Sequence, residues 1–116
     1  MVFKQQIGRF QLVQSMITDM AVGIESARAL TYRLAWLKSQ GAKQARKEAS
    51  IAKMVASDVA FMAATNAVQI HGAYGCSGES PVSRYFRDAK VFQIVEGQNQ
   101  LHRRLIAEYQ LGYRAD

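Results

Sequence analysis

The sequence predicts an all-α fold, an antiparallel up-down helical bundle, and three observations support it. Apolar residues recur at steps of three and four over long stretches, which is the period of one helical face. The 116 residues contain one proline and only eight glycines, most of them between those stretches. The composition, 49% hydrophobic and 21% charged, is typical of a globular chain, and this length suits one core. Residues 1–116 are therefore interpreted as a single helical domain.

The first predicted helix runs from about Arg9 to about Gln40. Gly41 is well placed to end it, because a glycine enters the left-handed conformation of a helix C-cap without a side-chain clash. The apolar positions that share one face of this helix are Val13, Ile17, Met20, Ile24, Ala27, Leu30, Leu34 and Leu37.

The second predicted helix runs from about Ala42 to Ile70. It combines a row of small residues with a neighbouring row of larger ones, so it can approach one helix closely and bury a broader apolar face as well. The small row is Ala45, Ala49, Ala52, Ala56, Ala60, Ala63 and Ala67, and the larger residues are Ile51, Val55, Val59 and Met62. Two long antiparallel helices joined by a tight turn are the simplest arrangement.

Residues 72–80 are rich in glycine and are expected to form a loop. Ser80 and Pro81 are suited to begin a third, short helix, with the serine as N-cap and the proline in the first turn, and this helix should end near Lys90. The apolar residues 91–95 are expected to form a buried, tightly turned connection.

A last helix is expected after Gly97, because Leu101, Leu105, Ile106 and Tyr109 again show helical spacing. Gly112 is expected to close it.

Composition and motifs exclude several classes of protein. A single cysteine, Cys76, forms no internal disulfide, so a cytoplasmic setting is the default expectation. Two distant histidines and no metal-binding motif give no metal site, and neither a signal peptide nor a membrane span is expected. The net charge of +6 suggests anionic partners, but the basic residues lack the interleaved aromatic residues of a nucleic-acid groove, so solvated helix faces are favoured.

Glu96 and Gly97 form the one specialised pair, because they follow an apolar run and are expected to open the last helix. Two interpretations remain open. A carboxylate after Phe92, Ile94 and Val95 in an apolar pocket would have a raised pKa and could act as a general base. Alternatively, Glu96 is a first-turn glutamate that the helix dipole favours.

Four segments of the sequence resemble motifs of one family in the same order and at matching spacing. They are Phe3–Gln11 (FKQQIGRFQ), Glu48–Lys53 (EASIAK), Ala67–Gly75 (AVQIHGAYG), and Arg87-Asp88-Ala89 followed by Glu96-Gly97. From Phe3 to Gly112 the chain resembles the C-terminal helical domain of the flavin-dependent acyl-CoA dehydrogenases.

The resemblance implies a reaction in which a glutamate removes the α-proton of an acyl thioester while the β-hydride passes to N5 of FAD. Glu96 matches the catalytic base, and Glu96 and Gly97 match positions at the substrate. The backbone N–H of Glu96 and a ribityl hydroxyl of the flavin are implied as donors to the thioester carbonyl.

Five further positions match FAD contacts of the family: Phe3, Gln69, Gly72, Gln98 and Gln100. The resemblance implies that the first three contact the cofactor across a subunit interface. Without it, Phe3 would be an ordinary hydrophobic residue, and Gln69 and Gly72 the end of a helix.

Some positions depart from the family pattern. Gln98 stands where threonine or serine is usual, Val95 where tyrosine is common and Lys4 where glycine is common. Arg87 and Asp88 are interpreted as an internal ion pair or capping pair with no catalytic role.

The family enzymes also have an N-terminal helical domain, a central β domain and an earlier bundle helix that these residues do not include. We therefore expect the 116-residue chain alone to be inactive.

An apolar groove between the two long helices should favour a homodimer or homotetramer. The resemblance leaves open a CoA or carrier-protein thioester, reoxidation by an electron-transfer flavoprotein or by oxygen, and a cytoplasmic or mitochondrial matrix location. The alternative function is a noncatalytic helical oligomerisation module derived from the family.

Overall fold

The computed structural model describes residues 3–116, and all regular secondary structure within them is helical. There are four α-helices, α1 (Gln11–Ser39), α2 (Arg46–His71), α3 (Pro81–Phe92) and α4 (Asn99–Gln110). Two short 3-10 helices, η1 (Ile7–Arg9) and η2 (Gly72–Cys76), precede α1 and follow α2. The predicted all-α fold is confirmed.

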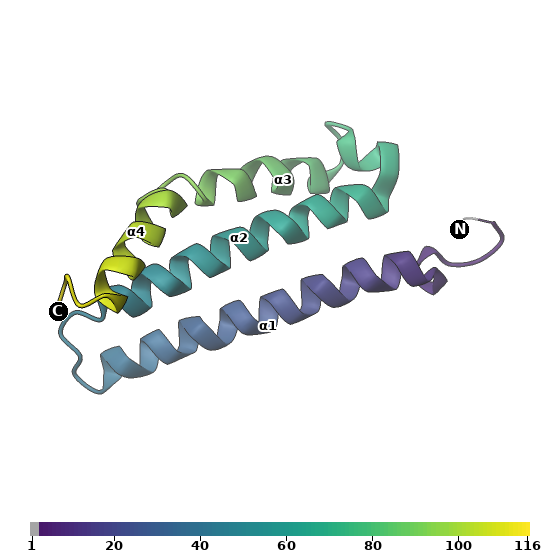
Figure 1. Ribbon diagram of the computed structural model, residues 1–116. Helices are drawn as coiled ribbons and strands as arrows, with labels where there is room; N and C mark the ends of the chain where they lie inside the picture. Colours follow the sequence, from purple (N-terminus) through teal and green to yellow (C-terminus); the bar gives the residue numbers. More distant parts are fainter. Residues whose placement is uncertain (1–2) are drawn as a thin grey trace.

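Helix α2 lies at the centre of three layers (Figure 1). Helix α1 runs antiparallel along one side of it, and α3 and α4 return along the other side, end to end. Within the described residues α2 packs against all three of these helices, whereas α1 makes no contact with α3 or α4. The result is an elongated slab of 57 × 25 × 24 Å.

The core of this slab is thin. The buried hydrophobic residues of the described chain are all alanines: Ala27, Ala45, Ala52, Ala64 and Ala89. Many large apolar side chains are exposed along α1 and along α3 with the turn after it, including Leu12, Ile17, Trp36, Phe92 and Ile94. The radius of gyration is 17.6 Å, against about 13 Å for a compact domain of this length. Two apolar faces of the described chain are therefore uncovered.

The apolar groove predicted between the two long helices lies elsewhere. Helices α1 and α2 pack directly on one another, and Val59 and Met62 of α2 come against Gly23 of α1. A hollow with largely apolar walls instead lies between α2 and α3, with Ala63, Ala64 and Tyr85 among its lining residues. Ala56, Ala60, Ala63, Ala64 and Ala67 of α2 line hollows with α3 and its following turn, whereas Val59 and Met62 lie against α1.

The predicted end of the first helix is confirmed at Gly41, which has φ +88°. Its N–H donates to Lys38 O at 3.1 Å, and the N–H of Ala42 donates to Leu37 O at 3.1 Å, which is the Schellman pattern of hydrogen bonds. Helix α2 begins four residues later than predicted, because Ala45 has a left-handed backbone with φ 60° and ends the connection.

The region after α2 corrects two predictions about local structure. Residues 72–76, predicted as a loop, form the 3-10 helix η2. Pro81 is at the first position of α3 as predicted, but the Ser80 side chain makes no capping hydrogen bond, and its Oγ is buried without a partner among the described residues. Only 2% of the surface of Ser80 is exposed, so the surrounding chain encloses this unpaired hydroxyl.

The connection predicted over residues 91–95 is tightly turned but not buried. Helix α3 continues to Phe92, and Val91, Phe92, Ile94 and Val95 are between 42% and 58% exposed. Phe92 and Val95 line a pocket with α2, and among the described helices α3 packs only on α2 and η2, so the other side of its end stays open. Helix α4 ends before Gly112 as predicted, with φ +74° at the glycine.

Helix α2 and η2 together form a helical stretch, Arg46–Cys76, that is long and apolar enough to cross a membrane by length and composition alone. This differs from the expectation that the chain has no such segment. The mean hydropathy of its most apolar window is 1.2, and 17% of that window is buried. In the fold it is the central helix, a position in which a largely apolar composition also serves packing.

Candidate functional site

The turn between α3 and α4 presents Glu96 in an unusual backbone conformation. Glu96 and Gly97 have φ values of +55° and +87°, so two consecutive residues are left-handed. For a residue with a Cβ this conformation costs about 1 to 2 kcal/mol. Such strain often marks a functional site, and the N–H of Asn99 closes the turn by donating to Gln93 O at 3.0 Å.

This geometry is incompatible with Glu96 as a first-turn glutamate of the last helix. Helix α4 begins at Asn99 with Gln98 as N-cap, and its first turn contains no acidic residue. Glu96 precedes the N-cap by two residues and belongs to the turn. The prediction that Glu96-Gly97 opens the helix is therefore wrong by two residues.

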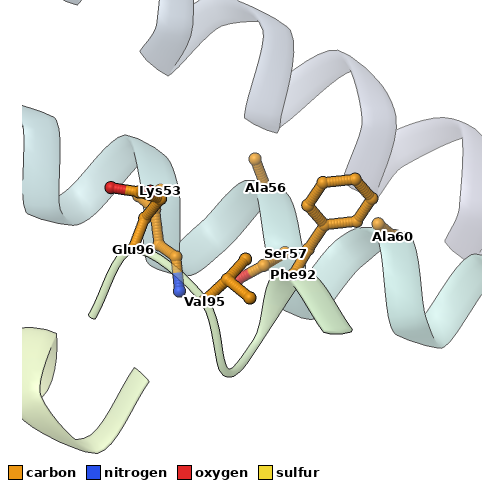
Figure 2. A pocket seen from close by; sticks show the side chains of 7 residues that line it. All are labelled: Lys53, Ala56, Ser57, Ala60, Phe92, Val95 and Glu96. Atoms are coloured by element: carbon orange, nitrogen blue, oxygen red, sulfur yellow. The ribbon is translucent and has the colours of Figure 1, made fainter. Parts of the chain in front are cut away.

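Glu96 lies at the edge of a pocket of about 320 Å³ between α2 and the end of α3 (Figure 2). Figure 2 shows Ala56 and Ala60 on α2, with Phe92 and Val95 beside them on the segment that leads to Glu96. Lys53 and Ser57 complete the lining. The predicted apolar surroundings of Glu96 are therefore present on one side, while Glu96 itself is exposed in the described chain.

Polar side chains of α2 form hydrogen bonds with the turn that carries Glu96. Lys53 Nζ donates to Gly97 O at 2.7 Å and to Asn99 Oδ1 at 2.8 Å. Asn99, which is buried, donates from Nδ2 to Ser57 Oγ at 2.9 Å and to Asp58 Oδ1 at 2.7 Å. Asp58 Oδ1 also accepts from Gln93 Nε2 at 2.8 Å. Both ends of the turn are thereby tied to one segment of α2.

A further contact comes from α4. His102 Nε2 lies 3.1 Å from Glu96 O, and because a carbonyl only accepts, Nε2 is the protonated nitrogen. The other nitrogen, Nδ1, is buried without a partner among the described residues. A Cβ on Gly97 would lie 3.0 Å from His102 Nε2, so this ring also limits position 97 to glycine.

None of these supporting residues was singled out from the sequence. Lys53 ends the segment Glu48–Lys53 that matched a family motif, and Lys53 and Ser57 are one helical turn apart on a common face. That spacing was the available signal. It did not reveal the partner, because Gly97 and Asn99 lie more than forty positions further along the chain.

The positions that matched FAD contacts fall into two groups. Gln98 and Gln100 are exposed beside Glu96 but line a separate, more polar hollow with Asp58, Gln93 and Arg103. Gln69 and Gly72 lie at the far end of α2, and the N-terminal segment with Phe3 is at that end of the molecule too (Figure 1). Gln69 is sixteen residues beyond Lys53 on one helix, which is about 24 Å at 1.5 Å per residue.

The chemistry of these positions is compatible with a dinucleotide. Gln69, Gln98 and Gln100 present exposed amides that can both donate and accept. At Gly72, with φ +63°, no atom lies within 4 Å of where a Cβ would be, so a ligand can approach the backbone. Phe3 is 87% exposed and contacts Phe10 edge-on, with 6.5 Å between ring centroids. The structure does not bring the two groups together within one chain.

Arg87 and Asp88 do not form the predicted ion pair within the described residues. Arg87 Nη1 donates instead to Ser83 Oγ at 2.8 Å, one turn back on α3. Asp88 is exposed at the hollow between α2 and α3. Adjacent residues on a helix point in directions about 100° apart, so the two side chains do not face each other.

A carboxylate beside an apolar pocket can remove a proton from a weakly acidic C–H group of a ligand bound there. Among residues 3–116 no group of three or more histidine, cysteine, aspartate or glutamate side chains could hold a metal ion.

Comparison with known proteins matches most of the chain to one protein family. The profile described as "Acyl-CoA dehydrogenase, C-terminal domain" matches residues 1–111. Cyclohexane-1-carbonyl-CoA dehydrogenase of Geobacter metallireducens is 48% identical over 105 residues, 90% of this chain and 27% of its own length. Subunit CarC of the caffeyl-CoA reductase–Etf complex of Acetobacterium woodii is 43% identical over 105 residues, again 90% of this chain and 27% of its own.

The fold agrees with these similarities. The structure of a glutaryl-coenzyme A dehydrogenase in complex with glutaryl-CoA superposes with a TM-score of 0.95 and 40% identity over 98% of this chain, which is 29% of that chain. The chain thus spans less than a third of the relatives that it matches.

Proposed function

The chain belongs to the family of the acyl-CoA dehydrogenase C-terminal domain, and from this premise we propose that it supplies the catalytic base and part of the FAD contacts of an acyl-thioester dehydrogenase. The substrate class is an acyl thioester of CoA or of a carrier protein. The relatives are more than three times as long as this chain, so the isolated 116 residues are expected to be inactive.

In the proposed reaction Glu96 accepts the α-proton of the acyl group on a carboxylate oxygen. The two electrons of the α C–H bond form the new double bond as the β-carbon loses a hydride. FAD, when bound, supplies the acceptor of that hydride. The backbone N–H of Glu96 is proposed as a donor to the thioester carbonyl, where negative charge develops. Phe92 and Val95 would contact the acyl chain and exclude water on the side of α2.

The observation that carries this proposal is the placement of Glu96. It is the one acidic residue that lines the apolar pocket, on a turn with a strained backbone and several side-chain supports.

The cofactor contacts are proposed at two places along α2, beside its middle and at its C-terminal end. Gln98 and Gln100 would contact FAD near the base, while Phe3, Gln69 and Gly72 would contact the FAD of a neighbouring copy. The separation of about 24 Å along α2 supports contacts from two copies. A homodimer or homotetramer is therefore the proposed assembly. An electron-transfer flavoprotein or oxygen is the proposed electron acceptor, and the cytoplasm or mitochondrial matrix the proposed location.

The test uses the full-length flavoprotein that contains this segment and compares the parent with Glu96→Gln. Flavin absorbance is followed after mixing with acyl thioesters. The parent should bleach, and the variant should bleach at least about 10³-fold more slowly while FAD stays bound, because an amide cannot accept the proton. Equal bleaching in both proteins would assign the base to another residue.

A second candidate function is a noncatalytic oligomerisation module derived from the family. The exposed apolar faces of α1 and of α3 with its following turn favour it, because surfaces of this kind are usually covered by a partner. Flavin affinity of the full-length protein separates the two candidates: a module that only assembles would show no stoichiometric FAD and no bleaching.

A further inference from the structure

We propose that Lys53 is a positioning residue for the base, which, through Gly97 O and Asn99, sets where the Glu96 carboxylate and its backbone N–H lie. The inference rests on the proposed function of Glu96 and adds to it a residue on α2. Lys53 is not proposed to touch the substrate or to move a proton.

The first support is the pair of contacts that Lys53 makes. Its Nζ lies 2.7 Å from Gly97 O and 2.8 Å from Asn99 Oδ1, so one ammonium group joins the residue after the base to the first residue of α4. Hydrogen bonds from a charged donor are stronger than those between neutral groups. Among the described residues, Gly97 O accepts no other hydrogen bond.

The second support is the strain in the turn. Glu96 and Gly97 are both left-handed, and a non-glycine residue persists in that conformation only when its surroundings impose it. The surroundings here are Lys53 on Gly97 O and His102 on Glu96 O. Removing the Lys53 donor leaves the Gly97 carbonyl unpaired in a part-buried position, and rotation of the peptide toward solvent would move Glu96 with it.

The third support is the arrangement of polar groups along α2. Ser57 and Asp58, about one turn beyond Lys53, both accept hydrogen bonds from Asn99 Nδ2. The side-chain N–H groups of Asn99 therefore donate to Ser57 and Asp58, while its Oδ1 accepts from Lys53 Nζ. An ion pair with the base itself is not part of this arrangement, because the ion pairs found among the described residues do not include Lys53.

The test compares Lys53→Met, Lys53→Gln, Lys53→Arg and Glu96→Gln in the full-length FAD-containing protein. Methionine keeps the length of the side chain and suits the apolar pocket, but it removes every donor. We expect kcat of Lys53→Met to fall about 10- to 100-fold with little change in KM and in FAD content, since small displacements of a reacting group cost rates of this order. Lys53→Arg, which keeps the cation and its donors, should recover part of the rate.

A matched control is Lys47→Met on the same helix. Lys47 Nζ donates to Gln110 Oε1 at 2.7 Å, at the far end of α4 from the base. This variant also loses one lysine and one contact between α2 and α4, so it reports the effect of that loss on folding alone. Its kcat should equal that of the parent.

A second readout separates positioning from stability. With substrate deuterated at the α-carbon, a displaced base makes proton removal more rate-limiting, so the isotope effect on flavin bleaching should rise in Lys53→Met and stay unchanged in Lys47→Met. An unchanged isotope effect and unchanged kcat in folded Lys53→Met would overturn the proposal. If Lys53→Met does not fold, kcat is compared among the parent, Lys53→Arg and Lys53→Gln and should decrease in that order. Equal kcat values in the three proteins would overturn the proposal.

The Glu96→Gln variant distinguishes failure of the positioning role from failure of the proposed function. Slow bleaching by Glu96→Gln together with normal kinetics of Lys53→Met would reject only the positioning role. Normal bleaching by Glu96→Gln would reject the assignment of the base itself.

Discussion

At the level of single residues, the turn that presents Glu96 depends on the absence of a side chain at Gly97. With φ +87° and His102 Nε2 3.0 Å from a virtual Cβ, an alanine there is strained by its backbone and by contact. We expect Gly97→Ala to lower the free energy of unfolding by about 1 to 2 kcal/mol, measured by urea denaturation. Gly78→Ala is the control, because no atom lies within 4 Å and its φ is not positive. Equal effects of the two substitutions would contradict the explanation.

Another residue-scale prediction concerns Glu108 on α4. A hydrogen bond from Arg114 is the main cause that lowers the pKa of Glu108 below its ordinary 4.5, and Arg104, at 2.8 Å, lowers it further, while desolvation opposes both. Because the pKa is lower in the folded chain, the stabilisation is present above pH 4.5 and is lost as pH falls through the folded-state pKa.

Side-chain NMR titration tests this contact. Glu108 should titrate below pH 4.5 in the parent chain, and Arg114→Gln should raise the midpoint toward that value. Arg28→Gln, which removes an ion pair with Glu25 on α1, should leave the Glu108 midpoint unchanged. No change in Arg114→Gln would mean that the contact is absent in solution.

At the level of elements, the close packing of α1 on α2 depends on the size of Gly23. A Cβ at this position would lie 3.1 Å from both Met62 and Val59. In a helix alanine is favoured over glycine by about 1 kcal/mol, which offsets the tight contact, so Gly23→Ala should be nearly neutral. Gly23→Leu should destabilise by about 1 to 3 kcal/mol, because the added carbons separate the helices.

Thermal unfolding followed by circular dichroism measures the difference. Val22→Leu is the control on the same helix, since Val22 is 61% exposed and the larger side chain has room in solvent. A Tm of Gly23→Leu equal to that of the parent would show that the two helices are not packed as described.

At the level of the whole molecule, the thin alanine core and the uncovered faces predict self-association. Leu12, 81% exposed on α1, represents the uncovered surface. We expect the full-length protein to be a dimer or tetramer in light scattering across a dilution series. Leu12→Lys should shift dissociation to higher protein concentration, because a buried unpaired charge disfavours an apolar interface. Asp19→Lys, which makes a larger change of charge at an exposed polar position of α1, is the control. A monomer at all concentrations would contradict the expectation.

The fold was predictable from the sequence to the extent that it depends on local patterns. Helical periodicity located α1, α2 and α4, and Ser80 with Pro81 located the start of α3. The left-handed positions at Gly41 and Gly112 follow from the lack of a side chain. Errors occurred where contacts with other parts of the chain decide the structure. Ser80 is enclosed by the surrounding chain and forms no cap, and Val91, Phe92, Ile94 and Val95 are exposed at the open end of α3.

The candidate site divides in the same way. Glu96 was recognisable from its motif and from the apolar residues before it, so the sequence by itself determined the helices, the family and the candidate base. Only the tertiary structure decided that Lys53, Asn99 and His102 surround the turn and that Gln69 lies far from it. The physical reason is range: periodicity, capping and backbone conformation act between near neighbours in the chain. The hydrogen bond from Lys53 to Gly97 O joins residues 44 positions apart, so it exists only once α2 and the turn have packed together.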